Sequence, residues 1–191
     1  MKRTLLATTA IVALSASGAH ASLTGYTSGP DASFFPISFF FDNSGADVLN
    51  LSIDGATADA GTVVWDTIGT VGGTAIVGGT AGVDTSLVSF SFGAGDFASG
   101  DTFSLSSLDP DFTGLPSSGV SIFELIGVSV SASFSDSSTF FGTFVDDPAD
   151  GAGLVLKGET IGAVPLPAGL PLMLAGLGAL GIASRRRRNN A

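Results

Sequence analysis

The sequence has no cysteine and only one histidine, His20, among its 191 residues. Without cysteine, the chain has no disulfide, no thiol nucleophile and no cysteine-based zinc site. His20 lies in an N-terminal segment that we expect to be removed, so the exported part would have no histidine either. Catalysis of the Ser-His-Asp or Cys-His type and a histidine-ligated metal centre are therefore excluded from that part.

Positive charge is scarce in the middle of the chain. All 17 acidic residues lie between Ser22 and Ala163, where Lys157 is the single base, and the other bases lie near the two ends. Such a surface repels phosphate backbones, so we expect no nucleic acid partner. The sequence has no Walker A motif and no dinucleotide-binding glycine motif, and no cofactor is predicted. The chemistry that remains is that of carboxylates and of oxygen ligands for hard cations.

The N-terminus has the order of a secretory signal peptide. Residues 1–3 carry two bases, residues 5–14 are mostly apolar, and residues 19–21 form a cleavage site of the A-x-A type. The apolar stretch is too short to span a membrane. We therefore expect signal peptidase to remove residues 1–21 by cutting between Ala21 and Ser22.

The C-terminus combines a proline motif, an apolar tail and a basic cluster. Residues 169–183 are uncharged, and a helix over 168–183 would be about 24 Å long, against about 30 Å for the hydrocarbon core. We expect one transmembrane helix in the membrane lipid, with the basic cluster on the cytoplasmic side. The alternative is a buried core helix followed by a basic tail. The motif is Val164, Pro165, Leu166, Pro167 and Ala168, and the cluster is Arg185, Arg186, Arg187 and Arg188.

Residues 164–191 resemble the VPLPA variety of the PEP-CTERM sorting domains, which exosortases read in Gram-negative bacteria. The resemblance rests on the complete pentapeptide, the apolar tail and the arginine cluster, in that order and at the end of the chain. It implies processing near Val164–Ala168 by a membrane-embedded transpeptidase, whose catalytic cysteine belongs to that enzyme. It also implies a precursor anchored in the inner membrane and a final place in the cell envelope, on the surface or in the extracellular matrix.

Between the two targeting segments, residues 22–163 have the pattern of one all-β domain. Apolar residues alternate with serine over 88–92 and 128–135, as in strands with one buried and one solvated face. We expect further strands at residues 33–42, 48–53, 61–68, 102–108, 139–145 and 153–157. We expect turns at residues 42–45, 54–55, 78–79, 93–96, 109–111 and 147–151.

This pattern predicts an antiparallel β-sandwich, with the jelly roll as one form of it. No repeat of fixed period is visible, which argues against a solenoid. The chain has 15 phenylalanines and one tryptophan, Trp65, and these supply a core that a disordered stalk would lack.

Aspartate clusters are the first candidate site in this domain. Asp109 and Asp111, or Asp146, Asp147 and Asp150, could supply several oxygen ligands to Ca²⁺ from one loop. Neither cluster has the spacing of an EF-hand. Aspartate is also a common turn residue and a charge that protects sheet edges, which is the alternative interpretation.

Glu124 and a run of phenylalanines are the other candidates. Glu124 shares the parity of an apparent core stripe, and a buried carboxyl could act as a general acid. Glycoside hydrolysis needs a second carboxylate, which the sequence does not mark, and the alternative is a register change near Gly127 or an edge position that exposes Glu124. Carbohydrate platforms usually employ Trp and Tyr, so core packing is favoured for the phenylalanine run, which consists of Phe34, Phe35, Phe39, Phe40 and Phe41.

The sequence thus predicts an exported, acidic β protein with a structural or binding role and no enzymatic activity. One alternative is a calcium-dependent carbohydrate-binding or adhesion module, whose partner would be an extracellular polysaccharide. The other is a glycoside hydrolase that uses carboxylates. We further expect that folding does not require calcium, because the aromatic core suffices for it.

Overall fold

The computed structural model describes residues 21–29, 36–67, 69–80, 84–115, 119–147 and 153–162. Ala21 and Ser22 are included, whereas the predicted sorting motif and the arginine cluster lie outside the described residues. Across those ranges the structure has strands and two short 3-10 turns but no α-helix, which confirms the predicted all-β class. The same ranges hold no helical segment with the length and apolar character needed to span a bilayer.

The strands are β1 (Ser22–Ser28), β2 (Ile37–Ser44), β3 (Val48–Asp54), β4 (Val63–Thr67), β5 (Thr70–Gly73), β6 (Gly78–Thr80), β7 (Leu87–Ser91), β8 (Thr102–Phe112), β9 (Ser129–Phe134), β10 (Thr139–Asp146) and β11 (Leu154–Ile161). The two 3-10 turns are η1 (Gly55–Thr57) and η2 (Ile122–Leu125).

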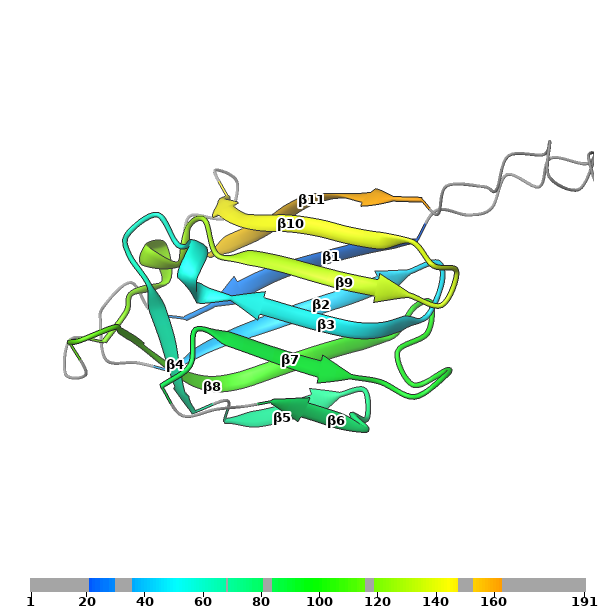
Figure 1. Cartoon of the computed structure of the whole chain (residues 1–191), viewed down its shortest axis with the longest axis horizontal. Helices are drawn as coiled ribbons and strands as arrows, with labels where there is room; N and C mark the ends of the chain where they lie inside the picture. The colour runs from blue at the N-terminus through cyan, green and yellow to red at the C-terminus, as the bar shows by residue number, and fades with distance from the viewer. Residues whose placement is uncertain are drawn as a thin grey trace, which may run out of the picture.

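A single curled sheet contains these strands. Their order is β4-β8-β2-β1-β11-β10-β9-β3-β7-β6, with β5 also paired to β8, and the strand pairings are antiparallel. The sheet folds over on itself, so that β9, β3 and β7 lie in front of β1, β2 and β8 (Figure 1). The antiparallel arrangement is therefore confirmed, and the two layers belong to one continuous hydrogen-bonded sheet.

Inward-facing aromatic side chains fill the space between the layers. Phe39 and Phe41 of β2 are fully buried and contact Phe144 of β10, with ring centroids 5.2 and 6.3 Å apart. Phe103 of β8 contacts Phe90 of β7 in the same way, at 5.2 Å. Burial of each such side chain contributes about 1.5–3 kcal/mol, so these cross-layer contacts are a main source of stability.

The two ends of the curled sheet meet beside β4. The backbone N–H of Trp65 donates to the carbonyl of Thr85 at 2.9 Å, and the indole Nε1 donates to the carbonyl of Ser86 at 2.8 Å. Trp65 is fully buried and lies edge-on to Phe39. Further along the same edge, β5 pairs with β8 and β6 pairs with β7, so residues 70–80 connect the two ends of the sheet again.

Pairing of the first and last strands places the two ends of the domain together. Tyr26 of β1 is opposite Val155 of β11 in an antiparallel pair, so the beginning of β1 lies beside the end of β11. This end is on the right in Figure 1, and the 3-10 turns η1 and η2 are at the opposite end. Loops near η1 and η2 are therefore the part of the domain furthest from where the chain enters and leaves it.

Two of the predicted turns are wrong, and a third, at residues 42–45, is misplaced because β2 continues to Ser44. Gly78 and Gly79 belong to β6 and pair with β7, and residues 109–111 are part of β8, which runs on to Phe112. Pro110 is tolerated there because the pairing of β8 with β2 has ended at Leu108, so no N–H is needed on that side. The predicted strands correspond to β2, β3, β4, β7, β8, β9, β10 and β11, whereas β1, β5 and β6 were not predicted.

Candidate functional site

A trough of about 510 Å³ crosses the outer face of β7, β3, β9, β10 and β11, on the side of the sheet that faces away from the core. We call it the outer trough, and the side chains that line it are those of Ser52, Asp54, Leu87, Ser129, Ser131, Phe141, Thr143 and Lys157.

The strand register explains why these residues, which are far apart in the sequence, come together. Ser52 of β3 is opposite Ser131 of β9, and Ser131 is opposite Phe141 of β10, so the three side chains form one row across the sheet. A second row, parallel to the first, runs from strand to strand through Leu87, Asp54, Ser129, Thr143 and Lys157. Alternation along each strand turns both rows outward while the intervening residues enter the core.

Hydroxyl groups give the trough its hydrogen-bonding capacity. Next to it, polar side chains bond to each other, for example Ser52 Oγ to Ser89 Oγ at 2.9 Å. On the floor of the trough, the hydroxyls of Ser129, Ser131 and Thr143 make no hydrogen bond to any residue that the structure describes. Each of these hydroxyls can therefore donate and accept a hydrogen bond with a ligand.

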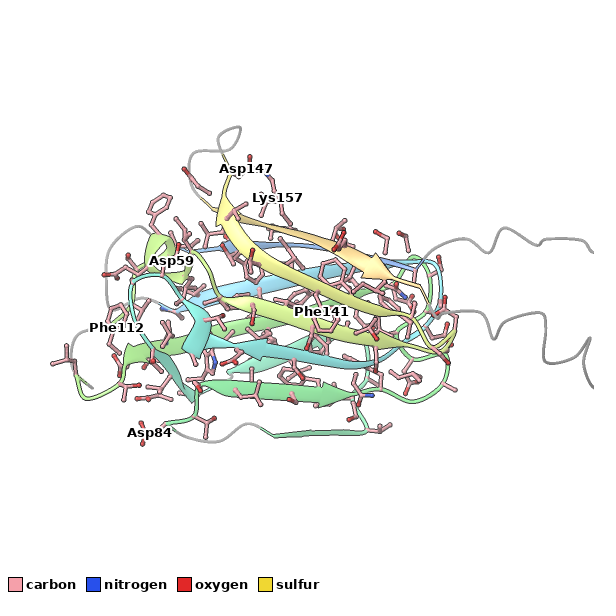
Figure 2. All side chains as sticks on the ribbon, turned by 45° about the horizontal axis from the view of Figure 1, so that its top comes forward. Asp59, Asp84, Phe112, Phe141, Asp147 and Lys157 are labelled. Carbon is pink, nitrogen blue, oxygen red and sulfur yellow. The ribbon has the colours of Figure 1, made fainter. Side chains whose placement is uncertain are left out.

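Phe141 and Lys157 stand on the β10–β11 side of the trough (Figure 2). The Phe141 side chain is 52% exposed, although it lies in the middle of a strand and not in a loop. Lys157 is exposed and makes no salt bridge within the described ranges. Beside them, Gly142 of β10 is opposite Gly158 of β11. A Cβ added at Gly158 would lie 2.5 Å from the Gly142 Cα, so the close approach of the two strands requires a glycine there.

A second group of polar side chains lies at the junction of β4, β8 and the segment before β7. Because Trp65 is opposite Thr85, Asp66 of β4 and Asp84 of the segment before β7 flank this bridge, and Asp109 and Asp111 lie on β8 beside β4. Asp84 and Asp111 line a hollow of about 280 Å³ there. We call Asp66, Asp84, Asp109 and Asp111 the acidic seam.

Charge repulsion and burial act on Asp66 in this seam. Burial of its carboxyl, a hydrogen bond with Asp84 and repulsion from Asp111, Asp84 and Asp109 raise the pKa of Asp66 above its ordinary value of 3.8. Its Oδ1 atom is enclosed and has no hydrogen-bond partner among the described residues. Asp111 differs, because its buried carboxylate accepts a hydrogen bond from the N–H of Gly119 at 3.0 Å.

The predicted calcium clusters are located as follows. Asp109 and Asp111 are part of the acidic seam, on a strand and not in the turn that we expected. Asp146 ends β10 and Asp147 follows it, whereas Asp150 lies outside the described residues. In the parts of the chain that the structure covers, no three acidic side chains are arranged so that they could hold a metal ion.

Glu124 has a structural role at the start of η2. The segment is a 3-10 turn and not a strand, so the expected parity with Ile122 does not apply, and Ile122 is buried together with Leu125. Glu124 Oε2 accepts hydrogen bonds from the backbone N–H of Ser121 at 2.8 Å and from its hydroxyl at 2.9 Å. The carboxylate thus holds the first turn of η2, as in one half of a capping box.

The predicted phenylalanine run is divided between the two faces of β2. Core packing is confirmed for Phe39 and Phe41, which are fully buried. Phe40 points outward and stacks on Tyr26, with ring centroids 4.7 Å apart. Phe34 and Phe35 lie outside the described residues. The outer trough, which combines hydroxyls and both signs of charge with an exposed ring, is the better candidate for a binding site.

No protein family, no curated protein and no solved structure matches this chain. The evidence for the candidate site is therefore the geometry of the site itself. The outer trough was not predicted from the sequence. The serines at 129, 131 and 133 identified a solvated strand face, but only the register between strands shows that Phe141 and Lys157 stand beside them.

Proposed function

We propose that the chain is an exported protein of the cell envelope or surface, processed by an exosortase-type system, with a binding role and no enzymatic activity. Signal peptidase and the exosortase would act on its two ends, and membrane lipid would hold the precursor. The sandwich-type scaffold would present a binding face. No carboxylate of that face would act as a catalytic acid or base.

The bounds of the folded domain support this proposal. β1 begins at Ser22, directly after the predicted cleavage site, and β11 ends at Ile161, just before the sorting motif at Val164. Both processing events would therefore leave every strand intact. Since β1 begins and β11 ends at the same end of the domain, a membrane anchor after β11 would leave η1 and η2 directed away from the membrane.

The single observation that carries the binding role is the outer trough. It combines an exposed aromatic ring, unpaired hydroxyls and one charge of each sign in a hollow of about 510 Å³. Ligand sites are typically concave and combine apolar surface with a few convergent polar groups. A purely structural protein would have no need for such a combination on a solvated sheet face.

Production of the full chain in a Gram-negative host with a VPLPA-reading exosortase tests the proposal. We expect the exported protein to begin at Ser22, to lose its tail only when the exosortase is present, and to become accessible to protease added to intact cells. Intact-mass measurement and cell fractionation give these results. An N-terminus at Met1, or protein that stays in the cytoplasm, would contradict the proposal.

A further inference from the structure

We infer that the outer trough binds an uncharged polysaccharide chain, which lies across β7, β3, β9, β10 and β11 with a sugar ring against Phe141. This inference rests on the binding role proposed above and names the ligand class of the same site.

The charged residues in and around the trough favour an uncharged ligand. Asp54 and Lys157 lie three strands apart in the second row, about 14 Å at ordinary strand spacing, and their charges balance within the trough. Outside the trough acidic residues dominate: Glu159 is opposite Phe141, and Lys157 is the only base among the described residues. A polyanion would be repelled by this surface, and the balanced charges of Asp54 and Lys157 give a polycation no net attraction within the trough.

Shape selects a chain over a small molecule. The floor consists of serine and threonine, whose short side chains leave room between the taller Phe141 on one side and Leu87 on the other. Leu87 is 49% exposed, so both walls offer apolar surface. The distance from β7 to β10 is about 14 Å, which suits a short run of sugar rings and exceeds the size of one ring.

Hydroxyl and aromatic groups select a sugar. A sugar ring has an apolar face of C–H bonds, which packs on an aromatic ring, and a rim of hydroxyls. The rim can exchange hydrogen bonds with the side-chain hydroxyls of Ser129, Ser131 and Thr143, which make no hydrogen bond to the described residues. A peptide strand is a poorer fit, since it binds sheets through backbone groups at an edge, and these strands already have neighbours on both sides.

Affinity electrophoresis tests the inference with the full-length protein in mild detergent. The protein is run in native gels that contain hydroxyethyl cellulose, dextran or alginate, and the retardation relative to an empty gel is measured. We expect at least one of the two uncharged polymers to retard the protein, whereas alginate, a polyanion, does not. Phe141→Ala should weaken the apparent affinity by about tenfold or more, because an aromatic anchor in a hollow carries a large share of binding energy.

Two further variants make the result specific to the trough. Ser131→Tyr fills the floor beside Phe141 and should also abolish retardation, which keeps the test valid if Phe141→Ala folds poorly. Phe123→Ala removes another exposed phenylalanine, on η2 and outside the trough, and should behave like the wild type. Circular dichroism confirms that each variant is folded.

The inference is overturned if neither uncharged polymer retards the wild type, if only alginate does, or if folded Phe141→Ala and Ser131→Tyr are retarded like the wild type. The N-terminus and tail processing of the same preparations are determined by intact mass. Normal processing without retardation rejects the polysaccharide site alone, whereas a failure of export and processing rejects the proposed function.

Discussion

Asp66 shows how one residue can link the local arrangement of carboxylates to the stability of the fold. Its pKa is raised, so over the pH range between 3.8 and the higher folded value the native protein binds more protons than the unfolded chain. Stability from this residue is therefore fully present below pH 3.8 and is lost as the pH rises through the folded pKa. At neutral pH, the Asp66 charge opposes folding, since Asp84, Asp109 and Asp111 are close to it.

Asp66→Asn should consequently raise the melting temperature at pH 7, because the amide keeps a polar group opposite Asp84 and removes the repelled charge. The gain should become smaller as the pH is lowered toward 4, where the wild-type carboxyl is increasingly protonated. Thermal melts followed by circular dichroism from pH 4 to pH 8 measure both effects. Asp42→Asn, at an exposed position of β2, is the matched control. An Asp66→Asn melting temperature at pH 7 that is unchanged or lower than that of the wild type would contradict the prediction.

Single residues also mark the limit of what the sequence could predict about the site. Ser129 and Ser131 were assigned to the solvated face of a strand, because serine alternates there with apolar residues. Phe141 could not be distinguished from Phe140 and Phe144, which are buried, until the register of β10 was known. The sequence therefore contained the residues of the outer trough but not the information on which of them face one another.

At the scale of secondary structure elements, strands with strong alternation were predictable and weakly patterned strands were not. β7 and β9 alternate large apolar residues with serine, and both were predicted. β1 contains Gly25, where an added Cβ would lie 2.8 Å from the Phe40 carbonyl oxygen, so a small residue replaces the apolar one that the pattern requires. Strand β6 has two glycines and pairs only with β7, and its composition is that of a turn.

The short β4 is the element that closes the curled sheet, and Trp65 is its central contact. Trp65→Phe removes the hydrogen bond from Nε1 to the partly buried Ser86 carbonyl, which keeps the backbone N–H of Gly55 as a donor, and it leaves unfilled space in the core where the indole was. We expect the free energy of unfolding to fall by about 1–3 kcal/mol. Urea denaturation followed by circular dichroism measures it, since Trp65 is the only tryptophan and its fluorescence is lost in the variant.

Phe123→Leu is the control for this change, because Phe123 is an exposed aromatic residue on η2. It should alter the free energy of unfolding by no more than about 0.5 kcal/mol. If Trp65→Phe were equally mild, the contact between β4 and the segment before β7 would not contribute to the closure of the sheet.

At the scale of the whole molecule, acidic charge and an aromatic core act in opposite directions. The acidic residues between Ser22 and Ala163 repel one another, and the core of buried phenylalanines offsets this repulsion. Metal ions would then act on the charges and not on the fold itself. A requirement for calcium would imply instead that a binding site supplies part of the folding energy.

The domain should therefore melt cooperatively in the presence of EDTA. Addition of millimolar CaCl₂ should raise the melting temperature only to the extent that MgCl₂ does at the same ionic strength, since both ions screen the acidic surface. Calorimetric scans of the same preparation in the three buffers measure this. Loss of the cooperative transition in EDTA, or a stabilisation by calcium that magnesium does not reproduce, would show that calcium is a structural ligand.

The predicted sorting motif would connect the domain to its proposed place in the cell, and its first residue is three residues after the end of β11. Pro165 and Pro167 restrict their own φ angles and disfavour helix in the residues before them, so the motif is expected to be extended. An extended segment that lacks two N–H donors can enter the active site of a protease or transpeptidase as a strand. The apolar tail would hold it at a fixed depth, and Arg185–Arg188 would prevent the tail from moving outward.

Replacement of Pro165 and Pro167 with alanine should therefore block maturation and leave export and membrane insertion intact, since the signal peptide, the apolar tail and the arginines are unchanged. The measurement is a gel shift between the membrane-bound precursor and the form without the tail, in a host with the matching exosortase. Pro171→Ala is the matched control, because it removes a proline of the tail outside the motif, and it should be processed normally. If the double variant is processed at the wild-type rate, residues 164–168 act only as a linker and the C-terminus serves as a plain membrane anchor.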